Sequence, residues 1–112
     1  MARSMAKWAA SELARSDRKC VMVTLTFDGM PEDWTGKDCT SAFNRFMTRF
    51  KRQYWCRDYL VCREVQDRGV YHYHMIVFDV DWLPFAEVEA LWGCGFVWLT
   101  AFDQPSRAVR YA

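Results

Sequence analysis

The amino-acid sequence predicts an α+β fold, in which a central and mainly antiparallel sheet has flanking helices. Two patterns lead to this prediction. Segments with alternating apolar residues, typical of strands, are separated by segments whose apolar residues recur at helical spacing. Two of the strand segments also follow one another across a short turn, and few of the strand connections are of the βαβ kind that builds parallel sheets.

Each element is indicated by its own local pattern. The first strand alternates apolar residues with polar ones. The longest helix carries a single apolar stripe, with Asp38 or Thr40 as its cap. Pro84 suits the first position of a short helix that Gly93 and Gly95 end. The expected elements are a helix over 3–16, a strand over 21–28, a loop over 29–36, a helix from about 40 to 54, strands over 59–66 and 71–78, a helix from 84, a strand over 96–102 and a helix over 106–112.

The composition limits the class of protein. A chain of 112 residues is expected to form one domain, here 1–112, with a core of its own. Its apolar share of 52% and aromatic share of 17% exclude a disordered protein. No apolar run approaches the ~18 residues that span a bilayer, and the N-terminus lacks a signal-peptide core. We therefore expect a soluble cytoplasmic protein with no membrane partner, whose five scattered cysteines are free thiols.

The charge of the chain says little about its partners. The formal net charge is +1, so overall electrostatics give no argument for nucleic-acid binding. Basic residues run from 45 to 57 without an intervening acid. Such a run more often forms a solvated helix face than a track for phosphates.

The only two histidines, His72 and His74, lie one residue apart in a predicted strand, just after a turn signal. Residues two apart in a strand point to the same face, so the two imidazoles project together while Tyr73 faces the other way. Packing gives no evident reason for two imidazoles side by side. They do form a good pair of metal ligands.

The turn before the histidines predicts a third ligand. The segment 67–69 (Asp-Arg-Gly) suits a three-residue hairpin loop with glycine at the left-handed position. Counting outward from this loop places Glu64 opposite His72 and Cys62 opposite His74. Directly opposed residues lie on one face of a hairpin, with Cβ atoms about 4.5–5.5 Å apart. A two-residue loop would instead turn Glu64 away from both histidines.

This polar face has three interpretations. The first is a solvent-facing side of the hairpin with coincidental histidines. The second is a structural zinc site that recruits Cys62, although structural zinc usually shows more cysteines in paired spacing. The third is a hard divalent cation, Mg²⁺ or Mn²⁺, held by Glu64, His72 and His74 with open positions for a phosphate substrate.

The hairpin resembles the second motif of the HUH endonucleases, a superfamily of replication initiators, relaxases and transposases named for its His–hydrophobic–His sequence. Tyr73 takes the hydrophobic position, and the segment 63–69, with its Arg-Glu-Val-Gln and Arg-Gly, is similar to rolling-circle initiators of small single-stranded DNA phages and plasmids. The segment 24–27 (Thr-Leu-Thr-Phe) matches the first motif, and 92–100 fits the segment before the catalytic helix. The resemblance covers about residues 21–112 in the right order.

The resemblance implies a ferredoxin-like HUH endonuclease fold and a nicking activity. In that family a tyrosine hydroxyl attacks a phosphodiester in single-stranded DNA, often at an origin hairpin. The enzyme stays linked to the 5′ phosphate and frees a 3′ hydroxyl for a polymerase. A phenol is a poor nucleophile at neutral pH, so the phosphate must be polarised. We therefore expect Mn²⁺ or Mg²⁺ at Glu64, His72 and His74, single-stranded DNA as partner, a host polymerase or helicase as a further one, and a bacterial host cell.

Tyr111 matches the catalytic tyrosine of the third motif, in which a lysine follows three positions later. The residues Arg110, Tyr111 and Ala112 begin this pattern, and the sequence then ends. Two interpretations follow: the sequence is a C-terminally truncated domain cut inside this motif, or the protein binds DNA without cutting it. A frayed or packed aromatic is the structural alternative for Tyr111. Arg107, one helical turn earlier, is positioned to meet a phosphate.

Thr24 and Thr26 share a face of the first strand, which in the HUH family lies beside the metal hairpin. They are candidates for supporting the site or contacting DNA, although threonine is common in strands. The many aromatic residues offer stacking partners for unpaired bases, but most are needed for the core. The function expected first is the initiation of rolling-circle replication. The alternatives are a relaxase or a single-tyrosine transposase of the same fold, and an origin-binding or repressor module without cleavage.

Overall fold

The computed structural model describes residues 19–56, 58–65 and 71–102. Several predictions concern other residues and lie outside this part of the chain: the helices over 3–16 and 106–112, the turn at 67–69, and the roles of Arg107 and Tyr111. The described elements follow the predicted order, and the strand bounds shift by at most three residues. They are β1 (Cys20–Leu25), α2 (Gly36–Tyr54), β2 (Tyr59–Val65), β3 (Tyr71–Phe78), α3 (Phe85–Trp92) and β4 (Val97–Phe102).

The four strands form one sheet in the order β2-β3-β1-β4, and every neighbouring pair is antiparallel. This confirms the predicted α+β class with an antiparallel sheet. The expectation about strand connections is wrong in one respect, because α2 joins β1 to β2 and α3 joins β3 to β4. Each crossover skips one strand, so the strands that it joins are parallel to each other with an antiparallel strand between them. This βαββαβ arrangement is the ferredoxin-like one.

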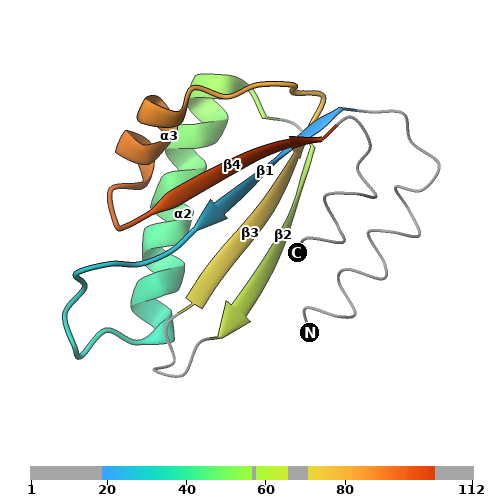
Figure 1. Cartoon of the computed structure of the whole chain (residues 1–112). Coiled ribbons are helices and arrows are strands. Elements are labelled where there is room, and N and C mark those ends of the chain that lie inside the picture. The colour runs from blue at the N-terminus through green and yellow to red at the C-terminus, as the bar shows by residue number, and fades with distance from the viewer. Residues whose placement is uncertain (1–18, 57, 66–70, 103–112) are drawn as a thin grey trace.

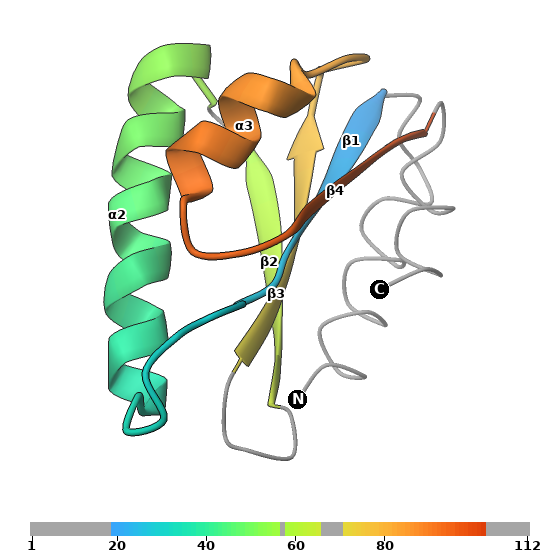
Figure 2. The ribbon, with the colours of Figure 1, turned by 60° about the vertical axis from the view of Figure 1, so that its left-hand side comes forward.

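Both helices cover the same face of the sheet, and the molecule has two layers in this region (Figures 1 and 2). Directly paired residues share a face, and the register pairs odd-numbered residues with odd and even with even on all four strands. Odd-numbered residues, such as Val23, Met75 and Val97, belong to the core cluster with α2 and α3. We call their side the helix face. The other side, which carries even-numbered residues, is the site face.

Aromatic rings fill much of the space between the helix face and the helices. The rings of Phe43 on α2 and Tyr73 on β3 stack with centroids 4.2 Å apart. Phe46, which is 1% exposed, has its ring centroid 5.4 Å from that of Phe50 and 5.8 Å from that of Trp92 on α3. The apolar stripe predicted for the long helix therefore forms core, because it faces the sheet along its whole length.

The long helix begins earlier than predicted, and its cap differs. Thr35 is the N-cap, and its backbone N–H donates to the Asp38 carboxylate at 2.9 Å. Asp38 thus lies in the first turn and closes a capping box, an arrangement that satisfies backbone donors at the helix start. Thr40, the other predicted cap, lies inside the helix and donates its hydroxyl to the Gly36 carbonyl at 3.0 Å. The helix ends where Trp55 adopts a left-handed conformation with φ 51°.

The end of β1 packs tightly against the turn between α3 and β4. The Thr26 carbonyl accepts a 2.7 Å hydrogen bond from the buried Trp92 indole. A Cβ atom on Gly95 would overlap the same carbonyl and would lie 2.7 Å from the Asp28 nitrogen. Gly93 has φ 64° and ends α3, as predicted. Among the described helices, none combines the length and the apolar character needed to cross a bilayer.

Candidate metal centre

The register of the β2–β3 hairpin is the predicted one. Glu64 pairs with His72, and Cys62 pairs with His74. Because paired residues share a face, all four side chains belong to the site face, and Tyr73 points to the helix face as expected. On the other side of β3, Thr24 of β1 pairs with His74. The tertiary structure therefore adds Thr24 to the histidines at the same end of the sheet.

His74 is held from both sides by polar partners. Its Nε2 lies 2.7 Å from Glu64 Oε1, and its Nδ1 lies 3.2 Å from Thr24 Oγ1. A neutral imidazole that donates from Nε2 to the carboxylate accepts at Nδ1, so the Thr24 hydroxyl donates in this arrangement. A hydroxyl can also accept a hydrogen bond, so Thr24 can hold the ring when the proton is on Nδ1 instead. The His74 side chain is 13% exposed and that of Glu64 is 46% exposed.

His72 lies beside this pair and is half-buried. Its ring centroid is 6.3 Å from that of His74, and the two rings are perpendicular. Burial lowers the pKa of His72, the nearby His74 lowers it further, and the Glu64 carboxylate acts in the opposite direction. These influences favour the neutral imidazole, which is the form that binds metals.

The three predicted ligands fit a divalent cation in donor type, but they do not yet enclose one. Glu64 Oε1 and His74 Nε2 are 2.7 Å apart, close to the ~3 Å between neighbouring ligands in an octahedral site with bonds of ~2.1 Å. Within the described ranges, no group of three His, Cys, Asp or Glu side chains is arranged to hold a metal ion. His72 is the side chain whose ring would have to turn toward the other two.

Cys62 lies on the same face but is a poor ligand in this environment. Its side chain is buried, at 8% exposure, opposite His74. Burial raises the pKa of the Cys62 thiol, and the charge of Glu64 raises it further. Both influences disfavour the thiolate, which is the form that binds zinc. The geometry therefore gives the zinc interpretation no support.

The two threonines of the first motif have different environments. Thr24 contacts His74, as described above. Thr26 is buried, at 8% exposure, and its hydroxyl lies 3.4 Å from the Phe96 carbonyl, which it faces as a donor. Its contacts therefore join β1 to the start of β4 and do not reach the histidines.

The basic run lies on the other layer of the molecule. Arg45, Arg49 and Arg52 are exposed on α2, which covers the helix face. The site face is on the opposite side of the sheet, so these guanidinium groups do not approach the histidines. This placement agrees with a solvated helix face.

Sequence reasoning missed two aromatic residues close to this site. Phe96 and Trp98 are 53% and 55% exposed, and Trp98 pairs with Thr24 in the β1–β4 register. The signal was present in the last strand, where Phe96 and Trp98 have the opposite parity to Val97 and Leu99. It could not be used, because the pattern alone does not say which parity faces the helices.

A family model described as a replication-associated protein of the ORF2 type matches residues 20–112. No curated protein and no solved structure matches the chain. The matched region includes the whole sheet, both described helices and the Glu64–His72–His74 group. The chain therefore belongs to this replication-associated protein family, and its role lies in DNA replication.

Proposed function

We propose that this chain is a metal-dependent endonuclease that nicks and joins single-stranded DNA to initiate rolling-circle replication. One observation carries the proposal: in a replication-associated protein, Glu64 and two histidines share one end of a sheet face, with Glu64 Oε1 and His74 Nε2 2.7 Å apart. A carboxylate and two imidazoles suit a divalent ion that keeps open positions for a phosphate. The likeness to the HUH endonucleases supports the same chemistry.

Glu64, His72 and His74 would hold Mn²⁺ or Mg²⁺. The ion, when bound, supplies Lewis-acid polarisation of the scissile phosphate and a template for its orientation. Thr24 is a positioning residue, because its hydroxyl lies 3.2 Å from His74 Nδ1 and fixes the direction of the opposite nitrogen. His72 contributes a neutral imidazole, since burial lowers its pKa.

Tyr111 is the proposed nucleophile, on the basis of its match to the third motif. Its phenolic oxygen forms a bond to phosphorus while the bond from phosphorus to the 3′ oxygen breaks. The phenolic proton is lost and the departing 3′ oxygen takes up a proton, which gives a 5′-phosphotyrosine and a free 3′ hydroxyl. Joining is the reverse reaction with an incoming 3′ hydroxyl. Arg107 is proposed to contact a phosphate.

A covalent-adduct experiment tests this function. The full chain is incubated with Mn²⁺ and a pool of random-sequence, single-stranded DNA oligonucleotides labelled at the 3′ end, and the products are separated under denaturing conditions. The label should travel with the protein, because the 3′ fragment keeps the 5′ phosphate that is joined to tyrosine. Chelation of the metal should abolish the adduct.

Two pairs of variants make the test specific. His72→Ala and Tyr111→Phe should lose the adduct, whereas Val65→Ala and Tyr59→Phe should keep it. Val65 lies on the same hairpin and is 65% exposed on the helix face, and Tyr59 is half-buried on that face. The mechanism is wrong if His72→Ala or Tyr111→Phe forms as much adduct as the parent.

The same material separates cleavage from binding alone. Tight binding of single-stranded DNA without any adduct, even in a chain extended to carry a lysine three positions after Tyr111, would favour the origin-binding or repressor module. Binding of Mn²⁺, measured by electron paramagnetic resonance of the free ion, gives a readout independent of activity. It should weaken in His74→Ala and stay unchanged in Val65→Ala.

A further inference from the structure

We propose that Phe96 and Trp98 form a stacking platform for unpaired bases of single-stranded DNA, beside the Glu64–His74 pair. This inference rests on the proposed function and names how the same site would recognise its substrate. The platform consists of two exposed aromatic rings at the start of β4. Its ligand class is the nucleobase of an unpaired strand.

The register places the platform in line with the polar group. Trp98 pairs with Thr24, and Thr24 pairs with His74, so the three residues form one row across β4, β1 and β3. Phe96 continues the same edge, because its carbonyl accepts the Thr26 backbone N–H at 3.0 Å. The ring centroids of Phe96 and Trp98 are 5.9 Å apart, with planes inclined at 50°.

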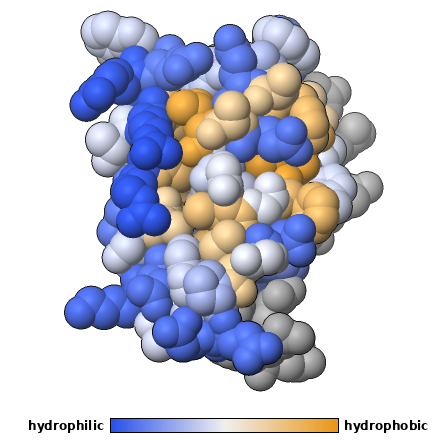
Figure 3. Space-filling model, turned by 90° about the vertical axis from the view of Figure 1, so that its left-hand side faces the viewer, coloured by the Kyte–Doolittle hydropathy of each residue, from blue (hydrophilic) through white to orange (hydrophobic). Residues whose placement is uncertain are grey.

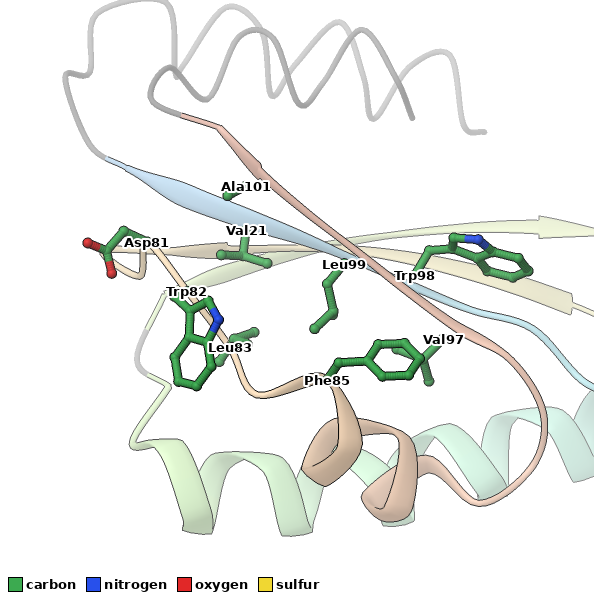
Figure 4. A pocket seen from close by; sticks show the side chains of 9 residues that line it. All are labelled: Val21, Asp81, Trp82, Leu83, Phe85, Val97, Trp98, Leu99 and Ala101. Atoms are coloured by element: carbon green, nitrogen blue, oxygen red, sulfur yellow. The ribbon is translucent and has the colours of Figure 1, made fainter.

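The two rings lie on the opposite side of β4 from the helices. In Figure 4, Val97 and Leu99 point toward α3 and the interior, whereas Trp98 lies on the other side of the strand. Val97 is 4% exposed, in contrast to 55% for Trp98. Neighbouring positions on one strand therefore differ by an order of magnitude in exposure, so the exposed position has no role in the core.

The exposure is confined to one end of the site face in the described part of the chain. Farther along the same face, Cys20, Met22, Ile76 and Phe78 are all buried. The end with the exposed rings is the end that carries His72 and His74. Large exposed aromatic side chains next to a polar site mark a binding surface more often than a scattered apolar residue does.

A second apolar surface lies on the other side of β4 and is not part of the platform. It is a groove of about 470 Å³ lined by Trp82, Leu83, Phe85 and Leu99 among others. Figure 3 shows hydrophobic residues gathered on that side of the molecule. The groove faces α3, away from the histidines, and we assign it no ligand.

Unpaired bases fit the platform better than paired ones. A base in a duplex has both faces covered by its neighbours, whereas an unpaired base can place one face on an aromatic ring. Two strand spacings of ~4.8 Å separate His74 from Trp98, a distance of about 10 Å. At a stacked rise of ~3.4 Å, a base on Trp98 would belong to a nucleotide about three steps from the phosphate at the histidines.

The test measures binding of the full chain to a fluorescent random-sequence single strand, without metal, by anisotropy. Trp98→Ala and Phe96→Ala should each weaken binding by about tenfold or more, the loss typical of one stacked base. Trp98→Phe should keep most of the affinity. Trp55→Ala is the matched control, because Trp55 is 78% exposed at the C-cap of α2, at the other end of the sheet.

Salt and strand pairing separate stacking from charge attraction. Raising the salt concentration should lower the affinity of every variant, because phosphate contacts release counterions. The ratio between parent and Trp98→Ala should stay constant, since stacking on a neutral ring involves no counterion. Binding of the matched duplex should be the same in both proteins.

Crosslinking of the unmodified chain gives an independent measurement. Ultraviolet irradiation with an iodouracil-substituted single strand should attach DNA to the peptide that contains Phe96 and Trp98. Attachment only to other peptides, or unchanged binding in Trp98→Ala, would overturn the platform. If the parent still forms the covalent adduct in that case, the proposed nicking function stands without it.

Two further outcomes are decisive. If the parent neither binds single-stranded DNA nor forms an adduct, the proposed function fails, and the platform fails with it. If Trp98→Ala reduces self-association of the chain, measured by sedimentation, and leaves DNA affinity unchanged, the rings form a contact between copies and the platform is rejected.

Discussion

The two faces of the sheet are built from the same strands but differ in almost every property. On the helix face, residues such as Val23 and Met75 are fully buried, and Tyr73 is stacked on Phe43. On the site face, a shift of one residue exchanges Tyr73 for His74, whose ring nitrogens contact Glu64 and Thr24. One position of register thus separates a packed aromatic from a polar group with both nitrogens engaged.

This difference assigns separate roles to the two faces. The helix face stabilises the fold, because apolar area removed from water is the main favourable term in folding. The end of the site face near His72 and His74 contributes less to stability and keeps polar groups accessible. Substitutions on the two faces should therefore change different measured quantities, and the following four predictions test that separation.

The largest effect is expected on the helix face. Phe46→Ala should lower the free energy of unfolding by about 3–5 kcal/mol, because it removes a ring that contacts Phe50 and Trp92 and leaves a cavity. His72→Ala on the site face should cost about 1 kcal/mol or less. Urea unfolding followed by circular dichroism measures both. Equal losses for the two variants would show that the site face also belongs to the core.

The contact between the end of β1 and the α3–β4 turn should be nearly as sensitive. Gly29 and Gly95 have φ 71° and 157°. Gly29→Ala should cost about 1–2 kcal/mol for the left-handed backbone alone. Gly95→Ala should cost more, because its Cβ would overlap the Thr26 carbonyl while Gly29 has open space around it. Thermal unfolding of both variants tests this, and a larger loss for Gly29→Ala would refute the close approach.

The third prediction concerns function without stability. Thr24→Val keeps the shape of the side chain and removes the hydroxyl that contacts His74 Nδ1. Mn²⁺ affinity and adduct formation should fall about 10–100-fold, the range for partners that orient a metal ligand, while the unfolding midpoint changes little. Thr100→Val, on the same face of β4, is the control and should leave both unchanged. Identical behaviour of the two variants would remove Thr24 from the site.

The smallest effect should appear at alkaline pH, at the buried end of the site face. Burial raises the pKa of the Cys20 thiol to about 11 from 9.0. The folded state therefore holds this proton more tightly than the unfolded state. Its contribution to stability is complete below pH 9 and is lost as the pH rises through 11.

At pH 10 the Cys20 contribution amounts to a loss of about 1 kcal/mol relative to neutral pH. Urea unfolding at pH 8 and 10 measures it. Cys20→Ala should show a smaller decrease between the two values than the parent. An equal decrease in both proteins would mean that the thiol is not buried in the folded state.

Several features could be predicted from local patterns with good physical reason. The loop of three residues determined the hairpin register, so turn chemistry alone could set Glu64 opposite His72. The helical stripe containing Phe43 and Phe46 could be assigned to the core, because its spacing leaves one apolar face. The cap of that helix was misassigned, since Thr35, Asp38 and Thr40 all have capping side chains and only the backbone conformation selects among them.

The resemblance to the HUH endonucleases, and not the residue pattern, indicated that the first strand lies beside the hairpin. Thr24 and His74 are 50 residues apart in the chain, and no local signal specifies their pairing. Nothing in the alternation of the last strand could show that Trp98 would join the same row. Such pairings depend on how the whole sheet packs against two helices, which is a property of all the strands together.

The sequence by itself therefore determined the elements, their order and the two histidines with Glu64 on one side of a hairpin. Local periodicity and turn length are sufficient for this, because they act over a few residues. Only the tertiary structure decided the strand order, the contact of Thr24 with His74, and the exposure of Phe96 and Trp98. These depend on long-range pairing and burial, which a single segment does not encode.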